Sequence, residues 1–138
     1  AFREACRARR CLIPANGFYE WTKDPDENRL PWYIHSAGDT PLVFAGVWQD
    51  WNLGGETLRA CAIVTCGANN RMSAIHHRMP VILSPSDWAL WLGEAGHGAA
   101  TLMKPAPEEA LAFYRVDTAV NSNRTVGPDL IAPLSVPE

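Results

Sequence analysis

The chain has 138 residues, 47% of them hydrophobic, and a formal net charge of −3. This size predicts one domain that buries a core without disulfide support. The net negative charge argues against a protein that binds nucleic acid electrostatically over its whole surface. No apolar run approaches the roughly 18 residues of a membrane span, and the N-terminal residues lack a signal-peptide pattern, so we expect a cytoplasmic protein without a membrane partner.

Positive charge gathers at the N-terminus. The first ten residues contain four arginines and one glutamate, a sum of +3, so the remainder carries −6. A local basic patch on an acidic protein predicts contact with a few phosphates and a shallow salt dependence. Residues 2–10 are predicted to form a short helix or a loop. Because the chain begins abruptly and without an initiator Met, we expect it to be the later part of a longer protein.

One carboxylate, that of Glu20, lies within a run of aromatic residues. The local pattern predicts the end of a strand at Leu12 and Ile13, a turn over residues 14–17 and a second strand over residues 18–21. Phe18 and Glu20 would share a face of that second strand. Burial beside aromatic rings raises the pKa of a carboxyl group, which suits a proton donor and acceptor near neutral pH. The alternative is a strand-edge glutamate that faces water or pairs with an arginine.

Apolar runs separated by turn residues predict a succession of strands after Glu20. We expect a polar hairpin loop over 23–29, a strand over 32–35, a turn over 38–41, a strand over 42–49 that is buried on both faces, a hairpin turn over 52–56, a second central strand over 58–65 and a polar loop over 66–71.

The later part of the chain adds one more long strand and short helices. A strand is predicted over residues 74–83, and Pro80 places it at an edge or bends it. The sequence Ser-Pro-Ser-Asp at 84–87 is a helix-start pattern, and that helix should end at Gly93. Its inner face is predicted to carry Trp88, Leu92 and Trp91.

The remaining elements are a loop over 96–100, a helix over 108–112, a strand over 113–116 and an irregular tail from 121. The predicted fold class is therefore α+β, with a mostly antiparallel, barrel-like sheet and a few short helices. We find no internal repeat and no linker, so residues 1–138 are expected to form a single domain.

Residues 75–80, Ile-His-His-Arg-Met-Pro, place two imidazoles and a guanidinium in an otherwise apolar run. In a regular strand His76 and Arg78 would share one face and His77 the other, so only one histidine could face Glu20. His76 and Glu20 are then a candidate acid-base pair, with Arg78 beside them to hold an anion such as phosphate. The alternative is a structural histidine and an arginine at the rim.

Motifs of several common enzyme classes are missing from the sequence. It contains no nucleophile elbow, no Gly-rich phosphate loop, no Walker or Rossmann motif and no HExxH. The cysteines form two C-x4-C pairs, a spacing too wide for a CxxC redox or zinc motif: Cys6, Cys11, Cys61 and Cys66. We predict buried free thiols and no metal or other cofactor. A metal site that combines these cysteines with His76 or His77 is the alternative.

Six tryptophans are many for this length. Three lie in apolar contexts and are predicted to belong to the core: Trp48, Trp88 and Trp91. Three border polar loops and could stack on the bases of single-stranded nucleic acid: Trp21, Trp32 and Trp51. Trp21 is the strongest candidate because it adjoins Glu20.

Several segments together resemble the SOS response-associated peptidase (SRAP) family. They occur in the family's order and span almost the whole chain: residues 10–21, 44–48, 62–65, 75–83 and the tail 116–121. The resemblance implies a sensor of abasic sites in single-stranded DNA, with self-processing peptidase activity. Such proteins join an N-terminal cysteine to the ring-opened sugar, where the α-amine forms a Schiff base that the thiol closes to a thiazolidine.

The resemblance also implies roles for individual residues. Glu20 matches the family's catalytic glutamate, and His76 matches the histidine that helps to open the sugar ring. Arg78 matches a DNA-contacting arginine, Thr65 lies where the family lines its pocket, and Trp21 is carried as a further DNA-binding candidate. The implied partner is single-stranded DNA that contains abasic sites, and we expect a monomer.

This chain departs from the family at the nucleophile. Residue 1 is alanine, and neither the family's N-terminal Cys-Gly-Arg motif nor its Asn-Ala-Arg-x-Glu-Thr segment is present. Cys6 and Cys11 are internal and have no free α-amine. We therefore expect the C-terminal part of an SRAP domain, which has the acid-base residues but forms no thiazolidine by itself. The alternatives are a non-covalent module that binds single-stranded DNA or modified bases, and a peptidase-like hydrolase that uses Glu20 and His76.

Overall fold

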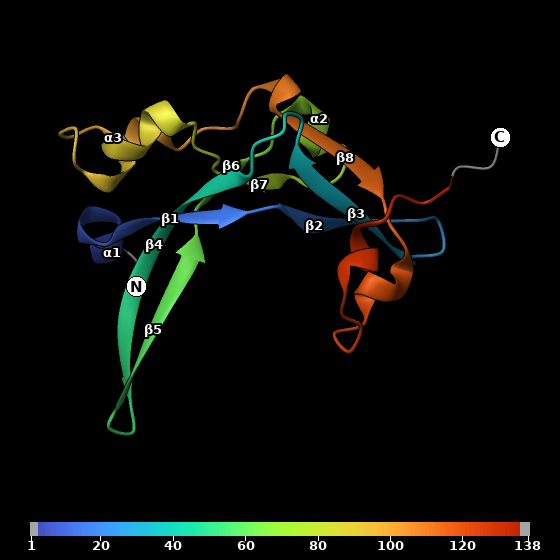
Figure 1. The fold of residues 1–138 in the computed structure, drawn as a ribbon, viewed down its shortest axis with the longest axis horizontal. Coiled ribbons are helices and arrows are strands. Elements are labelled where there is room, and N and C mark those ends of the chain that lie inside the picture. Colours follow the sequence, from blue (N-terminus) through green and yellow to red (C-terminus); the bar gives the residue numbers. More distant parts are fainter. Residues whose placement is uncertain (1–2, 136–138) are drawn as a thin grey trace.

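One extended run of chain links two sheets in the computed structural model, which describes residues 3–135 (Figure 1). Strand β1 (Arg10–Ala15) pairs with β4 (Leu42–Leu53), and β2 (Gly17–Lys23) pairs with β3 (Arg29–Ser36). Only Asn16 separates β1 from β2, so both sheets share a single, bent stretch of backbone.

Every strand pairing among the described residues is antiparallel. The sheet orders are β1-β4-β5, β2-β3-β8 and β6-β7, where β5 is Glu56–Ile63, β6 is Thr65–Gly67, β7 is Arg78–Pro80 and β8 is Leu111–Arg115. With a few short helices, this arrangement confirms the α+β, antiparallel fold class. The three sheets of residues 3–135 do not close into a barrel.

The turn predicted over residues 14–17 is wrong, because strand structure continues through Ala15 and resumes at Gly17. Pro14 is compatible with a strand here because β1 is at the edge of its sheet, where a missing backbone N–H removes no ladder bond. Gly17 is required by packing, since a Cβ atom there would lie 2.5 Å from the Tyr33 ring. Pro14 and Gly17, which suggested a turn, are therefore explained by the edge position of β1 and by the close contact with Tyr33.

Strand β4 is buried in its first half and exposed beyond Gln49, where the hairpin with β5 projects from the body of the molecule (Figure 1). The hairpin turn predicted over 52–56 is confirmed, with Gly54 and Gly55 both at positive φ. The prediction of a second central strand is wrong: β5 ends at Ile63, is the outer strand of its sheet and is mostly exposed. The loop predicted over 66–71 instead holds most of β6 and the start of a helix.

The strand predicted over 74–83 is wrong for its first part, because residues 74–77 are not strand. Arg78–Pro80 is paired as β7, and Ile82 forms an antiparallel bridge with Phe44 of β4. Asn69 caps the short helix α2 (Asn70–Ser73), accepting a hydrogen bond from Met72 N–H through its side-chain oxygen. The backbone N–H groups of Ile75 and His76 both donate to the Met72 carbonyl, which closes a turn after α2. His76 and His77 therefore lie on a turn and not on a strand.

Two further helices flank β1 (Figure 1). Helix α1 (Arg3–Ala8) precedes it, and α3 (Trp88–Leu92) packs against it. The helix start at 84–87 is a 3₁₀ turn, in which the Ser84 side chain makes no capping bond, and the predicted end at Gly93 is confirmed by a left-handed C-cap. Trp91 is 1% exposed, whereas Leu92, predicted to face inward, is 36% exposed.

Short 3₁₀ turns make up most of the remaining structure. They lie at Pro85–Asp87, Ala99–Leu102, Glu108–Ala110, Thr118–Asn121 and Pro128–Ile131. The late strand predicted over 113–116 is present as β8, but it begins at Leu111, where the helix predicted over 108–112 is only a 3₁₀ turn. The irregular tail returns to the second sheet through a bridge between Val116 and Pro133. Among the described residues, no helix has both the length and the apolar composition to cross a membrane.

The core lies where the inner halves of the strands meet α2 and α3. Its most buried large side chains include Ile34 of β3, Met79 of β7, Trp91 of α3 and Leu111 of β8. The Trp91 indole N–H donates to the carbonyls of Cys11 and Gly46, so this one ring ties α3 to two neighbouring strands.

We predict that Gly17→Ala destabilises the protein. The added methyl would lie 2.5 Å from the Tyr33 ring and 2.6 Å from the Ile34 carbonyl oxygen, so overpacking should lower the free energy of unfolding by about 1–3 kcal/mol. Urea unfolding measures this change as a lower midpoint. Gly38→Ala is the matched control, because its Cβ would meet only the Ser36 hydroxyl at 3.9 Å. Equal midpoints for the two variants would contradict the packing argument.

Candidate active site

The structure brings Glu20 and His76 together. Glu20 Oε2 lies 3.6 Å from His76 Nδ1, although the two residues are 56 positions apart and belong to β2 and to the turn after α2. The Glu20 side chain is 24% exposed and the His76 side chain 34% exposed. The predicted acid-base pair therefore exists as a geometric pair, in a partly buried position that remains open to a substrate.

The backbone of Arg78 holds the His76 ring. Nδ1 lies 3.0 Å from the Arg78 amide nitrogen and 3.1 Å from the Arg78 carbonyl oxygen. A neutral ring accepts the Arg78 N–H at Nδ1 and carries its proton on Nε2, whereas the imidazolium donates from Nδ1 to the carbonyl, with the Glu20 carboxylate close by. Both charge states of His76 thus find a partner, as a residue that gains and loses a proton requires.

Arg78 and Thr65 form the second contact of the site. The Arg78 guanidinium donates through Nη2 to the Thr65 carbonyl oxygen at 3.0 Å and to its Oγ1 at 3.1 Å. The two residues lie on the paired strands β6 and β7, and both are exposed. Only Nη2 is used among the described contacts, so the rest of the guanidinium fork stays available to an anion.

Two aromatic residues share the face of the sheet that carries Glu20: Phe18 of the same strand and Trp32 of β3. Phe18, two residues before Glu20, packs edge-on against Phe44 of β4 with ring centroids 5.7 Å apart. Trp32 of β3 is the direct cross-strand partner of Glu20 and donates its indole N–H to Thr22. Sequence reasoning considered Trp32 as a stacking residue but missed this pairing, which only the hairpin register reveals.

Trp21 is not grouped with Glu20. Neighbouring residues of a strand point to opposite faces, so Trp21 lies across the sheet, where it packs near Tyr19 with ring centroids 6.4 Å apart. Its indole N–H donates to Asn121 of the tail, and the Arg29 guanidinium lies 4.7 Å from its ring centroid. One face of the indole is thus already occupied by a cation.

His77 stacks on His76 with ring centroids 4.6 Å apart. The prediction that the two histidines point to opposite faces fails because it assumed a regular strand, and the turn after α2 instead places the rings side by side. The exposed His77 ring shields one face of the His76 ring.

The arrangement offers proton transfer and anion binding. Glu20 and His76 supply a carboxylate and an imidazole, and Arg78 supplies a positive charge nearby. Within residues 3–135, no Ser, Thr or Cys side chain hydrogen-bonds to Glu20 or His76, so the pair is not part of a serine- or cysteine-type triad there. This geometry gives no support to the peptidase-like hydrolase that attacks with a side-chain nucleophile.

The cysteines divide by exposure. Cys66 is buried and Cys11 is partly buried, whereas Cys6 and Cys61 are exposed, so the prediction of buried thiols is wrong for the last two. Residues 3–135 contain no group of three or more His, Cys, Asp or Glu residues placed to hold a metal ion. The alternative metal site is therefore not formed by this part of the chain.

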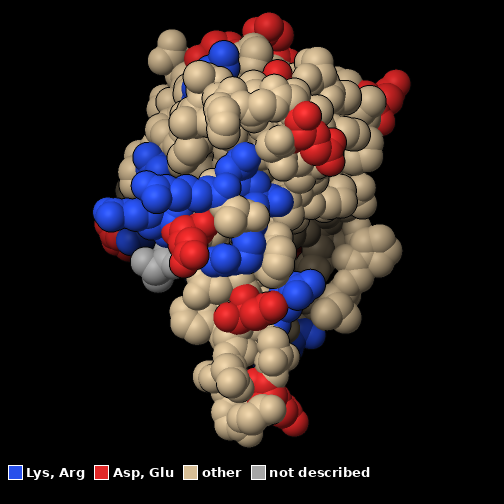
Figure 2. Space-filling view, turned by 90° about the vertical axis from the view of Figure 1, so that its left-hand side faces the viewer, with Lys and Arg blue, Asp and Glu red and all other residues tan. Residues whose placement is uncertain are grey.

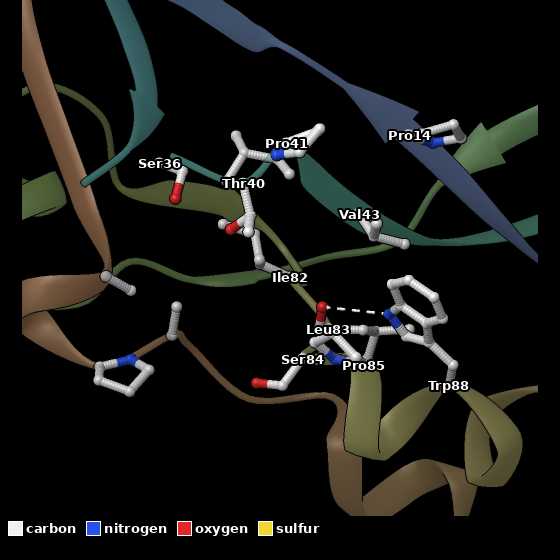
Figure 3. Close-up of a pocket in the computed structure, with 14 residues that line it drawn as sticks. Pro14, Ser36, Thr40, Pro41, Val43, Ile82, Leu83, Ser84, Pro85 and Trp88 are labelled. Atoms are coloured by element: carbon white, nitrogen blue, oxygen red, sulfur yellow. Dashed lines mark hydrogen bonds between the residues drawn. The ribbon is translucent and has the colours of Figure 1, made fainter. Parts of the chain in front are cut away.

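Figure 3 shows an apolar hollow in the structure. It has a volume of about 480 Å³ and is lined mainly by prolines and aliphatic side chains, with the Trp88 indole on one side donating to the Leu83 carbonyl at 3.4 Å. No residue of the predicted site lines it.

Comparison with known proteins places the chain in a family. Residues 1–123 match the profile of the family described as SOS response associated peptidase (SRAP). The Bacillus subtilis protein named "Abasic site processing protein YoqW" is 33% identical over 135 residues, which are 95% of this chain and 60% of that protein. The Pongo abelii protein named "Abasic site processing protein HMCES" is 30% identical over 159 residues, covering 94% of this chain and 45% of that protein.

A solved structure shows the same fold. A crystal structure of a protein from Bacteroides thetaiotaomicron superposes with a TM-score of 0.84 at 27% identity, over 97% of this chain and 60% of that one. The chain therefore spans about 60% of the length of YoqW and of this structural neighbour.

We predict that the thiols react in two classes. Burial raises the pKa of the Cys11 thiol, with nearby Cys61 adding to the effect, and burial also raises the pKa of the Cys66 thiol. At pH 8 fewer of these groups are thiolates, so iodoacetamide should modify Cys6 and Cys61 first, as read from peptide masses after a short pulse. Similar labelling of all four in urea is the control. Equal rates at Cys66 and Cys61 in the folded protein would contradict the assignment.

Proposed function

Because the chain belongs to the SRAP family, we propose that it supplies the acid-base part of a protein that captures abasic sites in single-stranded DNA through a covalent crosslink. The observation that carries the proposal is the 3.6 Å approach of Glu20 to His76 in a partly open site with Arg78 beside it. The names of YoqW and HMCES supply the substrate class.

The proposed chemistry is stepwise and balanced. An abasic sugar opens to an aldehyde, and the α-amine of an N-terminal cysteine adds to its carbonyl carbon. Loss of water gives the Schiff base, and addition of the cysteine thiol across the C=N bond closes a thiazolidine. Because amine and thiol belong to one residue, ring closure requires no second association. Each step moves protons, and none requires an oxidant or a reductant.

Glu20 and His76 would move those protons. His76 would help to open the sugar ring, since its ring presents Nε2 while Nδ1 is held by Arg78. Glu20 would take a proton from the attacking amine and return one to the departing water, as well as acting in self-processing and in reversal of the crosslink. The Glu20 side chain is 24% exposed and has Trp32 as its cross-strand partner, so few water molecules would compete for its protons.

Arg78 and Thr65 would hold the DNA next to the lesion. The guanidinium of Arg78 is exposed and fixed by Thr65, so it can meet a phosphate without first losing much side-chain freedom. Trp21 remains a proposed stacking residue, acting from the other face of the sheet on the side of its ring that Arg29 leaves free. We propose a monomer that acts in the cytoplasm on nucleoid DNA.

The nucleophile is the part of the proposal that this chain does not supply. Residue 1 is Ala, and the chain spans about 60% of YoqW. The non-covalent binding module therefore stays as the second candidate, and the two candidates differ in whether a covalent adduct forms.

We predict an SDS-resistant adduct between the whole encoded protein, including any residues that precede Ala1, and an oligonucleotide with one abasic site. The undamaged oligonucleotide should give none. Glu20→Gln and His76→Ala should each slow adduct formation by about 100-fold or more, since each removes a proton-transfer group. Gel electrophoresis of quenched time points measures the rate.

Glu56→Gln is the matched control, because Glu56 is an exposed glutamate at the tip of the β4–β5 hairpin. Its rate should equal that of the unchanged protein. Unchanged rates in Glu20→Gln would remove Glu20 from the mechanism, and loss of folded circular dichroism in His76→Ala would show that His76 mainly supports the fold. Tight binding of abasic DNA without any adduct would favour the non-covalent module.

We further predict that Arg78→Gln weakens DNA binding and lowers its salt dependence. Loss of one phosphate contact should reduce the slope of log K against log[salt] by about 0.7 for a single strand. Fluorescence anisotropy of a labelled oligonucleotide at several salt concentrations measures this slope. Arg59→Gln is the comparison, because the Arg59 guanidinium is already bonded to both Asp50 carboxylate oxygens. A larger effect in Arg59→Gln would reverse the assignment.

A further inference from the structure

A basic groove lies at the other end of the β1–β2 run from Glu20. It runs between α1 and the loop after α3, as two adjoining hollows of about 440 and 370 Å³ that share Arg7, Arg10 and His97 in their walls. No Asp or Glu lines either hollow. Figure 2 shows Lys and Arg side chains gathered on the side of the molecule that carries α1. The groove therefore concentrates positive charge on a protein whose net charge is −3.

Arg10 is fixed in the groove by the protein itself. Its Nε donates to the Trp91 carbonyl, and its Nη1 donates to the carbonyls of Cys6 at 2.8 Å and Arg7 at 3.0 Å, at the end of α1. Nη2 lies beside Gly93, where an added Cβ would be 3.1 Å from it. The guanidinium thus presents its remaining donors from a preset position, which reduces the ordering cost of holding an anion.

Arg7 and His97 line the groove together with Arg10. Both are exposed, and within residues 3–135 neither side chain makes a hydrogen bond or an ion pair. The nearest acids along the chain are Glu4 on α1 and Glu94 in the loop, both exposed and outside the lining of the groove. Among residues 3–135, therefore, no carboxylate pairs with the guanidinium of Arg7, which can bind an external carboxylate or a phosphate.

The loop after α3, which forms one wall of the groove, leaves its backbone accessible to a ligand. Gly96 and Gly98 flank His97, both at positive φ, and neither places a side chain over the groove. In the part of the chain that the structure describes, no backbone or side-chain acceptor binds the amide N–H of Gly96 or His97. Two guanidinium groups, an imidazole and free amides around one groove are the donor set that phosphate oxygens require.

We propose that this groove binds backbone phosphates of the DNA strand that flanks the abasic site. The proposal rests on the proposed function for the choice of DNA, whereas the donor set by itself specifies a phosphate group. Arg10 and Glu20 are ten residues apart along the extended β1–β2 run, so their Cα atoms are separated by at most about 35 Å. That span corresponds to about ten nucleotide steps at 3.4 Å each, so one strand of modest length can reach both positions.

The test combines a salt titration with a local probe. A labelled 20-nucleotide single strand with a central abasic site is titrated against the chain and its Arg7→Gln variant by fluorescence anisotropy. The variant should lose about 0.7 from the slope of log K against log[salt]. Arg124→Gln is the matched control, since Arg124 is an exposed arginine of the tail whose side chain makes no bond to the described residues. Its slope should not change.

The ring signals of His97 in NMR spectra, assigned with His97→Gln, report on the groove directly. They should shift with the oligonucleotide at concentrations where an equal amount of inorganic phosphate has no effect, and Arg7→Gln should abolish the shift. If His76 signals shift and His97 signals do not, the groove proposal fails while the proposed function stands. Equal response to inorganic phosphate would make the groove a small-anion site and overturn the DNA assignment. No response to the oligonucleotide at either histidine would overturn both.

Discussion

The bent run from Arg10 to Lys23 is the constraint on which the rest of the structure depends. Its first half pairs with β4 and its second half with β3, so one stretch of backbone fixes the position of two sheets. The close approach of Gly17 to the Tyr33 ring leaves no room for a side chain at the bend. Glu20 occupies a defined place because the strand that carries it is held on both sides of Asn16 by different partners.

His76 is positioned beside Glu20 by the turn that follows the capped helix α2, and not by a strand of a sheet. Asn69 starts α2, also donates to the Ala106 carbonyl, and is buried, so the turn that follows α2 has a fixed origin. From that origin the backbone of Arg78 holds the His76 ring, and the same residue extends its side chain to Thr65. The candidate acid-base pair and the cationic group are therefore parts of one connected unit, in which movement of Arg78 would alter both.

The pair of Glu20 and His76 was predictable from the sequence, but the secondary structure expected around His76 was wrong. Unusual polar residues in apolar surroundings identified both, but a regular strand was expected at His76, because Asn69 was not recognised as a helix cap. The edge position of β5 and the pairing of Trp32 with Glu20 depend on strand order and register, which arise from contacts between distant segments. Local patterns predict that a strand exists better than they predict its neighbours.

The outer position of β5 has a practical consequence for the isolated chain. Its free backbone edge, with Leu58 and Ile63 exposed at 55% and 43%, is the kind of strand on which a second molecule can add its own. The Arg59–Asp50 pair, with its charges held at 2.7 Å on the projecting hairpin, works against such stacking because an approaching copy must accommodate both charges. The two charges thus protect a free strand edge that contributes neither Glu20 nor His76, so this edge can be blunted by surface charge without involving the candidate acid-base pair.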